Sequence, residues 1–88
     1  MPSGIPTHSG RRVNPEQLGK RIRQIRKAHN LSQRKLAKQL GISQTLVGFF
    51  ERGQRRVPIN ILLEVSILGD VSLNWLVTGH EFKAGKKK

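Results

Sequence analysis

The side chains of this sequence that could take part in chemistry are mostly cations. Its 88 residues include 17 Lys and Arg against 5 Asp and Glu, which gives a formal net charge of +12. The three histidines, His8, His29 and His80, lack the spacing of metal ligands, and cysteine is absent. Paired carboxylates, a Ser/His/Asp order and a phosphate-binding loop are also missing, so we expect no enzyme activity, no cofactor and no metal. A polyanion is the expected partner, with nucleic acid as the leading candidate.

The cations are gathered in the first two-thirds of the chain. Residues 11–56 carry thirteen Lys and Arg and only two acids, Glu16 and Glu51. Residues 57–82 carry no Lys or Arg and three acids. We therefore expect the first part to face the polyanion and the second to face the core or another protein. Cations that served solubility alone would not stop abruptly at residue 56.

Length and hydropathy indicate a single small soluble domain. An 88-residue chain has no room for a second core. No apolar run approaches the ~18 to 20 residues that span a bilayer, and the N-terminus lacks the apolar centre of a signal peptide. The lack of cysteine fits a reducing compartment. We expect a cytoplasmic, nucleoid-associated protein with no membrane partner and no small-molecule ligand.

Capping residues and hydrophobic spacing predict an all-α chain. Asn14 and Pro15 are typical of an N-cap and a first helical residue, and Gln17 is placed to complete a capping box. Serines cap three further helices, and Pro58 begins another. Five short helices are expected, at residues 15 to about 29, 33–40, 44–52, 58–68 and 73–77.

The predicted domain spans residues 14–79. Residues 1–13 mix Pro, Gly and Ser with almost no apolar content, so they cannot repay the entropy of ordering. We expect a flexible basic arm there, which either follows a nucleic-acid groove with Arg11 and Arg12 or is inert. Residues 80–88 are expected to form a basic tail.

The second and third predicted helices form one unit, because only three residues join them. Such a close crossing needs a small side chain where the helices meet and a positive φ in the turn. Ala37 and Gly41, four residues apart, meet these two requirements. The other inward positions should be apolar, and they are Leu36, Leu40, Ile42, Val47 and Phe50.

The sequence of this unit resembles a known family. Residues 31–53 are LSQRKLAKQLGISQTLVGFFERG, and residues 72–79 are SLNWLVTG. Both stretches are similar to the helix-turn-helix domain of lambdoid phage repressors and Cro, the XRE family, and the resemblance covers about residues 15–79. It implies a compact five-helix domain of the lambda-repressor-like type. It also implies that residues 44–52 form a recognition helix in the major groove of double-stranded DNA.

Two glutamines match a pair that phage repressors use together. Gln33 and Gln44 each stand first in a predicted helix. The resemblance implies that Gln44 makes a bidentate contact to an adenine edge. It implies that Gln33 braces Gln44 and reaches a phosphate at the N-terminus of its own helix.

The predicted recognition helix has two faces. Val47 and Phe50, three residues apart, are expected in the core. The opposite face meets the bases and carries Gln44, Thr45, Gly48, Phe49 and Arg52. We expect Gln44, Thr45 and Phe49 to read bases, with Phe49 against a thymine methyl group. Gly48 would let the helix approach the bases closely. The alternative for Phe49 is a lid over its own core.

The family also implies an ion pair and a set of phosphate contacts. A glutamate at the position of Glu51 commonly pairs with an arginine of the first helix, and Arg26 holds the matching place. This pair would aim the Arg26 guanidinium at the DNA backbone, although Glu51 could also be a simple surface acid. The expected backbone contacts are Arg26, Gln33, Ser32, Arg34, Arg52, Arg55, Arg56, Arg11 and Arg12.

One domain of this size offers a small footprint, so a dimer on a two-fold operator is expected. The charge-poor residues 57–77 are the expected dimer surface, with contacts from Val57, Ile59, Leu73 and Val77. This homodimer could be weak without DNA. The sequence thus predicts a sequence-specific DNA-binding transcriptional regulator, a repressor of the Cro type.

Two alternatives stay open. An antitoxin would use the same motif to autoregulate its operon, and would bind a toxin through its tail or its last two helices. A basic membrane-surface protein, or a non-specific polyanion binder, would bind anionic vesicles without needing Gln44.

Overall fold

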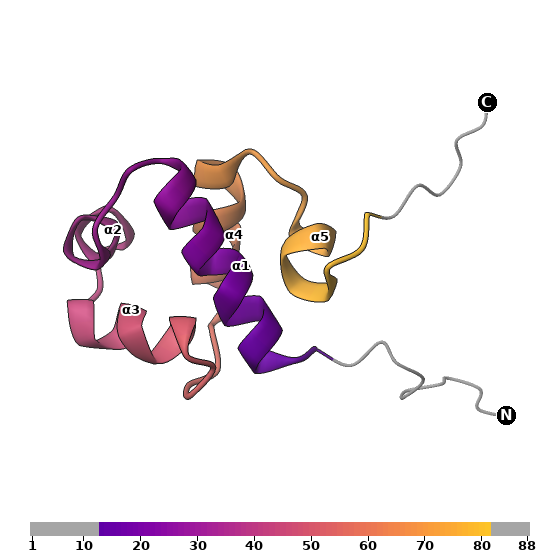
Figure 1. Cartoon of the computed structure of the whole chain (residues 1–88), viewed down its shortest axis with the longest axis horizontal. Coiled ribbons are helices and arrows are strands. Elements are labelled where there is room, and N and C mark those ends of the chain that lie inside the picture. Colours follow the sequence, from indigo (N-terminus) through magenta and orange to yellow (C-terminus); the bar gives the residue numbers. More distant parts are fainter. Residues whose placement is uncertain (1–12, 82–88) are drawn as a thin grey trace, which may run out of the picture.

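This computed structural model describes residues 13–81. They contain five helices and no strand (Figure 1). The helices are α1 (Pro15–Ala28), α2 (Gln33–Leu40), α3 (Gln44–Glu51), α4 (Ile59–Gly69) and α5 (Leu73–Thr78). The predicted all-α, five-helix fold is confirmed. Arg11 and Arg12 of the predicted arm lie outside the described residues.

Side-chain caps begin four of the five helices, as the sequence predicts. The Asn14 side chain accepts a hydrogen bond from the Gln17 backbone N–H at 3.0 Å. Ser32, Ser43 and Ser72 do the same at the starts of α2, α3 and α5. Each such bond satisfies an N–H group that has no partner inside its helix. The helix α4 differs, because Pro58 is its N-cap and gives no side-chain bond.

Two glycines end the helices of the central unit. Gly41 has a φ of 71° and closes α2 in the left-handed conformation that glycine adopts without strain. The turn to α3 is correspondingly tight. The helix α3 ends at Glu51, one residue earlier than predicted, with Arg52 as its C-cap. Gly53 follows with a φ of 73° and turns the chain towards α4.

The core draws on every helix. One fully buried aliphatic side chain comes from each, namely Ile22, Leu36, Val47, Val65 and Leu76. Burying a side chain of this size stabilises the fold by about 1.5–3 kcal/mol. Around these five pack further buried residues, including Phe50 of α3 and Val57 of the α3–α4 loop. The core therefore fixes α3 from one side only.

The helix α1 crosses the middle of the molecule, with α2 and α3 towards one end and α5 towards the other (Figure 1). It packs against α3, α4 and α5. Gly19 lies against the backbone of α3, because a Cβ atom there would lie 2.5 Å from the carbonyl oxygen of Phe50 and closer still to that of Glu51. Only glycine lets the two backbones come this near.

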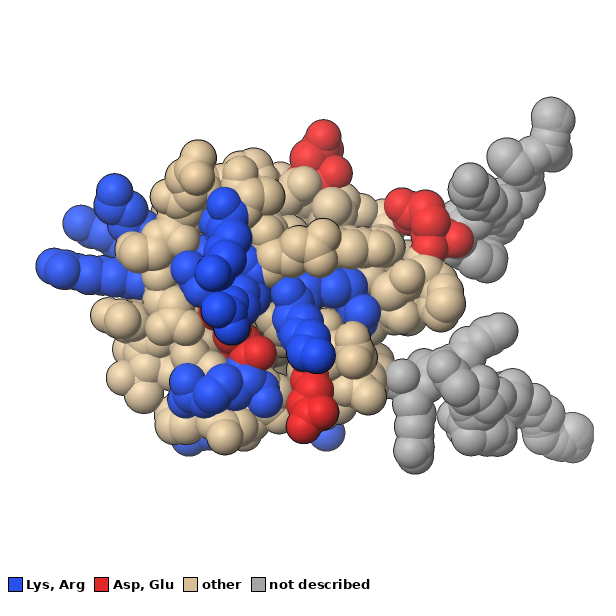
Figure 2. Space-filling model, viewed as in Figure 1, with Lys and Arg blue, Asp and Glu red and all other residues tan. Residues whose placement is uncertain are grey.

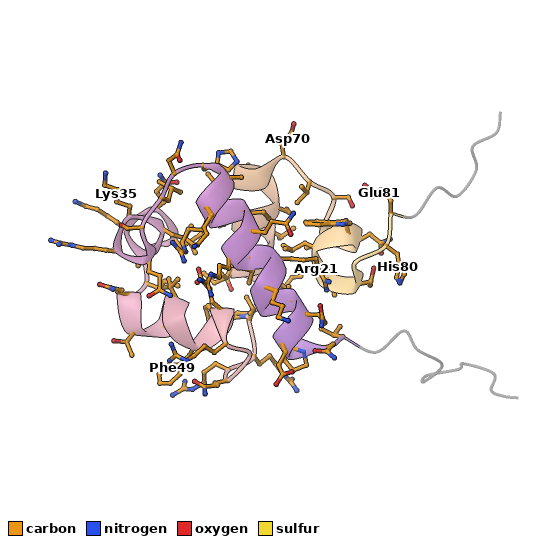
Figure 3. The ribbon with its side chains drawn as sticks, viewed as in Figure 1. Arg21, Lys35, Phe49, Asp70, His80 and Glu81 are labelled. Atoms are coloured by element: carbon orange, nitrogen blue, oxygen red, sulfur yellow. The ribbon has the colours of Figure 1, made fainter. Side chains whose placement is uncertain are left out.

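The charge separation seen in the sequence is also a separation in space. Lys and Arg side chains gather at the left and centre of the view, whereas Asp70 lies at the upper edge and Glu81 towards the α5 end (Figures 2 and 3). Within residues 13–81, no helix combines the length and the apolar character needed to cross a membrane.

Candidate nucleic-acid interface

The outer face of α3 presents polar side chains to solvent. Val47 and Phe50 are buried in the core, as predicted, and this anchors the inner face of the helix. Gln44 and Thr45 are exposed in its first turn. Phe49 is half-buried and lies at the lower edge of the molecule in the view of Figure 3. The structure therefore brings the three predicted base readers to one side of one helix.

An ion pair fastens α3 to α1. Arg26 donates from Nε to Oε2 of Glu51 at 2.6 Å and from Nη2 to Oε1 at 3.1 Å. It also donates from Nη1 to the carbonyl oxygen of Leu31 at 3.0 Å, so one guanidinium joins α1, the α1–α2 loop and α3. Two parallel bonds to one carboxylate give this pair a fixed geometry. The structure contains the Arg26–Glu51 pair that the sequence predicts.

Two residues that were predicted to contact the DNA backbone, Arg26 and Gln33, both bond to Glu51. The Arg26 side chain is only 11% exposed, and three of its five N–H groups are used internally, so at most two could reach a DNA phosphate, and that contact stays a prediction. Gln33 was predicted to brace Gln44. Its Nε2 instead donates to Oε1 of Glu51 at 3.1 Å. Gln33 thus braces the ion pair, because the buried carboxylate is a stronger acceptor than a solvated amide.

Gly48 does not offer the open surface that was expected of it. It is buried, and a Cβ atom there would lie 3.1 Å from Nη1 of Arg52. The Arg52 guanidinium therefore fills the space that the missing side chain leaves. The base contact at Gly48 stays a prediction, and it would require the exposed Arg52 side chain to move aside.

Phe49 is associated with two cations. The Cζ atoms of Arg52 and Arg55 lie 5.4 and 5.2 Å from the centre of its ring. Distances below about 6 Å allow a cation–π attraction. Arg52 is further held by a 3.0 Å bond from its Nε to Oε1 of Gln54. The sequence predicts a phosphate contact for each of these arginines, but it gives no reason for them to lie against one ring.

The remaining predicted backbone contacts surround α3. Arg34 and Arg56 are exposed, and so is Ser32, whose hydroxyl oxygen already accepts the Lys35 N–H as the cap of α2. Lys35 projects from the outer end of α2 (Figure 3). Exposed cations thus come from α2 and from the α3–α4 loop, the elements that precede and follow α3 in the chain. This arrangement suits a polyanion whose charges lie on both sides of a central ridge.

Two further residues, Gly19 and Arg21, position the helices, and neither was predicted from the sequence. Gly19 sets the distance between α1 and α3, and a glycine inside a helix, away from any cap, was the signal that could have revealed it. Arg21 holds α5. Its Nε donates to the carbonyl oxygen of Leu76 at 2.7 Å, and its Nη2 to that of Val77 at 3.1 Å. Burial lowers the pKa of the Arg21 guanidinium, but arginine stays protonated in proteins.

The predicted dimer surface is partly corrected. Val57, in the α3–α4 loop, is only 7% exposed and belongs to the core. Ile59 is 60% exposed, while Leu73 and Val77 are half-buried. An open hollow of about 490 Å³ lies beside this region, with lining residues that include Val13, Leu18, Leu62, Val77, Arg55 and Arg56. The surface available to a partner therefore includes the exposed Ile59 and a hollow whose lining is partly basic, rather than one flat apolar patch.

The chain is similar to known helix-turn-helix proteins. A sequence model described as helix-turn-helix matches residues 22–76. The uncharacterized HTH-type transcriptional regulator YobD of Bacillus subtilis (strain 168) is 35% identical over 57 residues, which are 65% of this chain and 51% of YobD. The similarity therefore spans about half the length of that relative.

Two solved structures have a similar fold. The restriction-modification controller protein C.AhdI from Aeromonas hydrophila is 36% identical, with a TM-score of 0.62 over 69% of this chain and 92% of its own. The P22 c2 repressor, crystallised with a synthetic operator, is 30% identical, with a TM-score of 0.66 over 72% of this chain and 96% of its own.

Proposed function

The chain belongs to the helix-turn-helix family, and from that membership we propose that it is a transcriptional regulator that binds a specific double-stranded DNA sequence with α3 in the major groove. The observation that carries the proposal is the outer face of α3. Gln44 and Thr45 are exposed there, on a helix whose inner face is locked into the core. An amide side chain can bond both N6 and N7 of an adenine. Gln44 is the residue that we assign to this contact.

Cations beside α3 would set the register on the DNA backbone. Arg34 of α2 and Arg52, Arg55 and Arg56 after α3 are exposed. The hydroxyl of Ser32 can still donate to a phosphate oxygen while it accepts the capping bond. Each phosphate neutralised in this way releases a counterion, so binding should weaken steeply with salt. Arg26 and Gln33 act in this proposal by holding α3, through Glu51.

The regulator is proposed to bind as a dimer and to repress. Half-sites about one helical turn apart would match two copies related by a two-fold axis. The exposed Ile59 lies in the charge-poor part of the chain, and the hollow, whose lining includes Val13, Val77, Arg55 and Arg56, offers a further surface for the second copy. Repression is supported by the similarity to the P22 c2 repressor, which was solved with an operator.

Selection of binding sites from random duplexes tests this proposal. The expected result is a preferred sequence with two-fold symmetry. The variant Gln44→Ala should then lose about 1–3 kcal/mol on that sequence alone, as expected for a base contact. If no sequence is preferred, and anionic vesicles bind the protein equally well with Gln44→Ala, the chain is a non-specific polyanion binder and the proposal fails.

One further observation favours an antitoxin as the second candidate. Ile59, Leu63 and Ile67 recur every four residues on α4, and all three are exposed. An exposed apolar stripe of this kind is typical of a surface that meets another protein. A toxin bound there would copurify with the protein from its native host, and Ile67→Lys would abolish the copurification without altering DNA binding.

A further inference from the structure

Phe49, Arg52 and Arg55 form a compact cluster at the C-terminal end of α3. The two guanidinium carbons lie 5.4 and 5.2 Å from the same ring centre, although their residues belong to the helix end and to the following loop. An aromatic ring attracts cations to its face because the face carries partial negative charge. The ring is therefore the common attachment point of two side chains that would otherwise be free to separate.

The cluster contains positive charge without a carboxylate. The only ion pair among residues 13–81 is Arg26–Glu51, so neither Arg52 nor Arg55 has an acidic partner in the described structure. Arg52 bonds to the neutral amide of Gln54. Neither charge is neutralised by an acid within residues 13–81, so an anion from outside would be attracted to both guanidinium groups. The cluster thus has the electrostatics of an anion site whose anion comes from outside the chain.

Gly48 contributes to the same arrangement. A Cβ atom at position 48 would lie 3.1 Å from Nη1 of Arg52, closer than ordinary side-chain contacts. The glycine therefore leaves room for the Arg52 guanidinium to lie along α3 towards Phe49. Gly48 and Phe49, which are consecutive in the sequence, thus together determine where the Arg52 guanidinium lies.

We propose that Phe49 is a positioning residue, and that its ring holds the Arg52 and Arg55 guanidinium groups as a clamp for a phosphate of the DNA backbone. The identity of the phosphate rests on the proposed function. The clamp replaces the earlier expectation that Phe49 reads a thymine methyl group, because cations already lie against the ring. Guanidinium groups suit phosphate because their N–H groups can donate in pairs to its oxygens.

The clamp makes a different prediction from base reading. A base reader strengthens binding to one sequence and leaves other duplexes unaffected. A clamp on phosphate strengthens binding to every duplex and steepens the dependence on salt. Substitution of Phe49 should therefore change affinity without changing sequence preference.

The test measures binding of wild type and variants to the selected operator and to an unrelated duplex, over a series of salt concentrations. Phe49→Leu should weaken binding to both duplexes by a similar factor of about 3 to 10, because leucine is apolar but cannot attract a cation. The slope of log affinity against log salt should fall by up to about 1. Phe49→Trp should keep wild-type affinity and slope, since tryptophan binds cations at least as well.

A double-variant background separates positioning from direct contact. When Arg52 and Arg55 are both replaced by Gln, Phe49→Leu should cause no further loss on either duplex. A loss confined to the operator, with an unchanged salt slope, would overturn the clamp and restore base reading. Equal losses from Phe49→Leu in both backgrounds would overturn it as well. Circular dichroism and thermal unfolding check that each variant is folded.

Failure of the proposed function looks different. If wild type shows no preferred sequence, sequence-specific regulation is excluded, but the clamp can still be measured on the unrelated duplex. If the preferred sequence is found and Phe49→Trp behaves like Phe49→Leu, only the clamp is excluded.

Discussion

Arg26 and Glu51 form a two-pronged ion pair that joins the last turn of α1 to the last residue of α3, with N–O distances of 2.6 and 3.1 Å. The two side chains are 11% and 4% exposed, so the pair is held largely away from water. Gln33 adds a third donor to the same carboxylate. The orientation of α3 relative to α1 therefore depends on one buried carboxylate.

Removing that carboxylate should destabilise the domain. In Glu51→Gln the Arg26 cation stays buried without its counter-charge, which costs about 3–5 kcal/mol in comparable buried pairs. Urea unfolding measures the loss. Glu64→Gln is the matched control, because Glu64 is an exposed acid on α4 and its removal should change stability by less than about 0.5 kcal/mol. Similar unfolding midpoints for the two variants would contradict the role given to the pair.

Two glycines inside helices should respond in opposite ways to alanine. Both have ordinary negative φ values, so alanine is favoured at each by about 1 kcal/mol of helix propensity. At Gly19 the added Cβ would collide with the backbone of Phe50 and Glu51, which cannot move without separating α1 from α3. At Gly48 it meets only the flexible end of Arg52.

We therefore expect Gly19→Ala to lower the free energy of unfolding by about 2 kcal/mol or more, as overpacked cores do. Gly48→Ala should leave it unchanged or raise it by up to about 1 kcal/mol. Thermal unfolding compares the stabilities of the two alanine variants. Because the substitution is the same, any difference between them comes from the surroundings of the two glycines. A larger substitution, Gly48→Leu, should displace Arg52 and harm DNA binding far more than folding.

Arg21 should tie α5 to the rest of the domain. In Arg21→Met the carbonyl groups of Leu76 and Val77 lose their donors, and each unsatisfied group costs about 1–3 kcal/mol where water cannot replace the bond. Trp75 is the only tryptophan of the chain and lies 6.0 Å from the Arg21 guanidinium. Its fluorescence should therefore change before the global transition in urea. A single unfolding transition of Arg21→Met at the wild-type urea midpoint would show that Arg21 is not needed to hold α5.

Most of the fold could be predicted because its signals are local. The caps at Asn14 and Ser43 act over three residues, and the buried pair Val47 and Phe50 follows from helical spacing. Contacts that depend on the tertiary fold gave no such signal. Arg21 reaches a carbonyl group 55 residues away, so nothing beside it in the sequence reveals the bond.

The candidate site shows the same division. The Arg26–Glu51 pair was predicted from a family pattern, and the structure contains it. Val57 was predicted at the dimer surface because residues 57–77 carry little charge. Composition does not say whether a loop side chain points into the core, and Val57 does. The cluster around Phe49 joins a helix to a loop whose path the sequence did not specify.

The two ends of the exposed stripe on α4 should differ in their effect on assembly. Ile59 lies next to the α3–α4 loop and the proposed dimer surface, whereas Ile67 is 74% exposed two turns further along the helix. Ile59→Lys places a charge in an apolar contact and should weaken the dimer by about tenfold or more, because an unpaired charge is costly to bury. Ile67→Lys carries the same charge outside that contact and should leave the dimer intact.

Sedimentation equilibrium gives the association constants of the variants. Comparing the affinity for a full operator with that for a single half-site shows whether the protein binds DNA as a dimer. Ile59→Lys should lose affinity for the full operator and keep it for the half-site, since α3 is untouched. If both variants assemble like wild type, the dimer surface lies elsewhere on the domain.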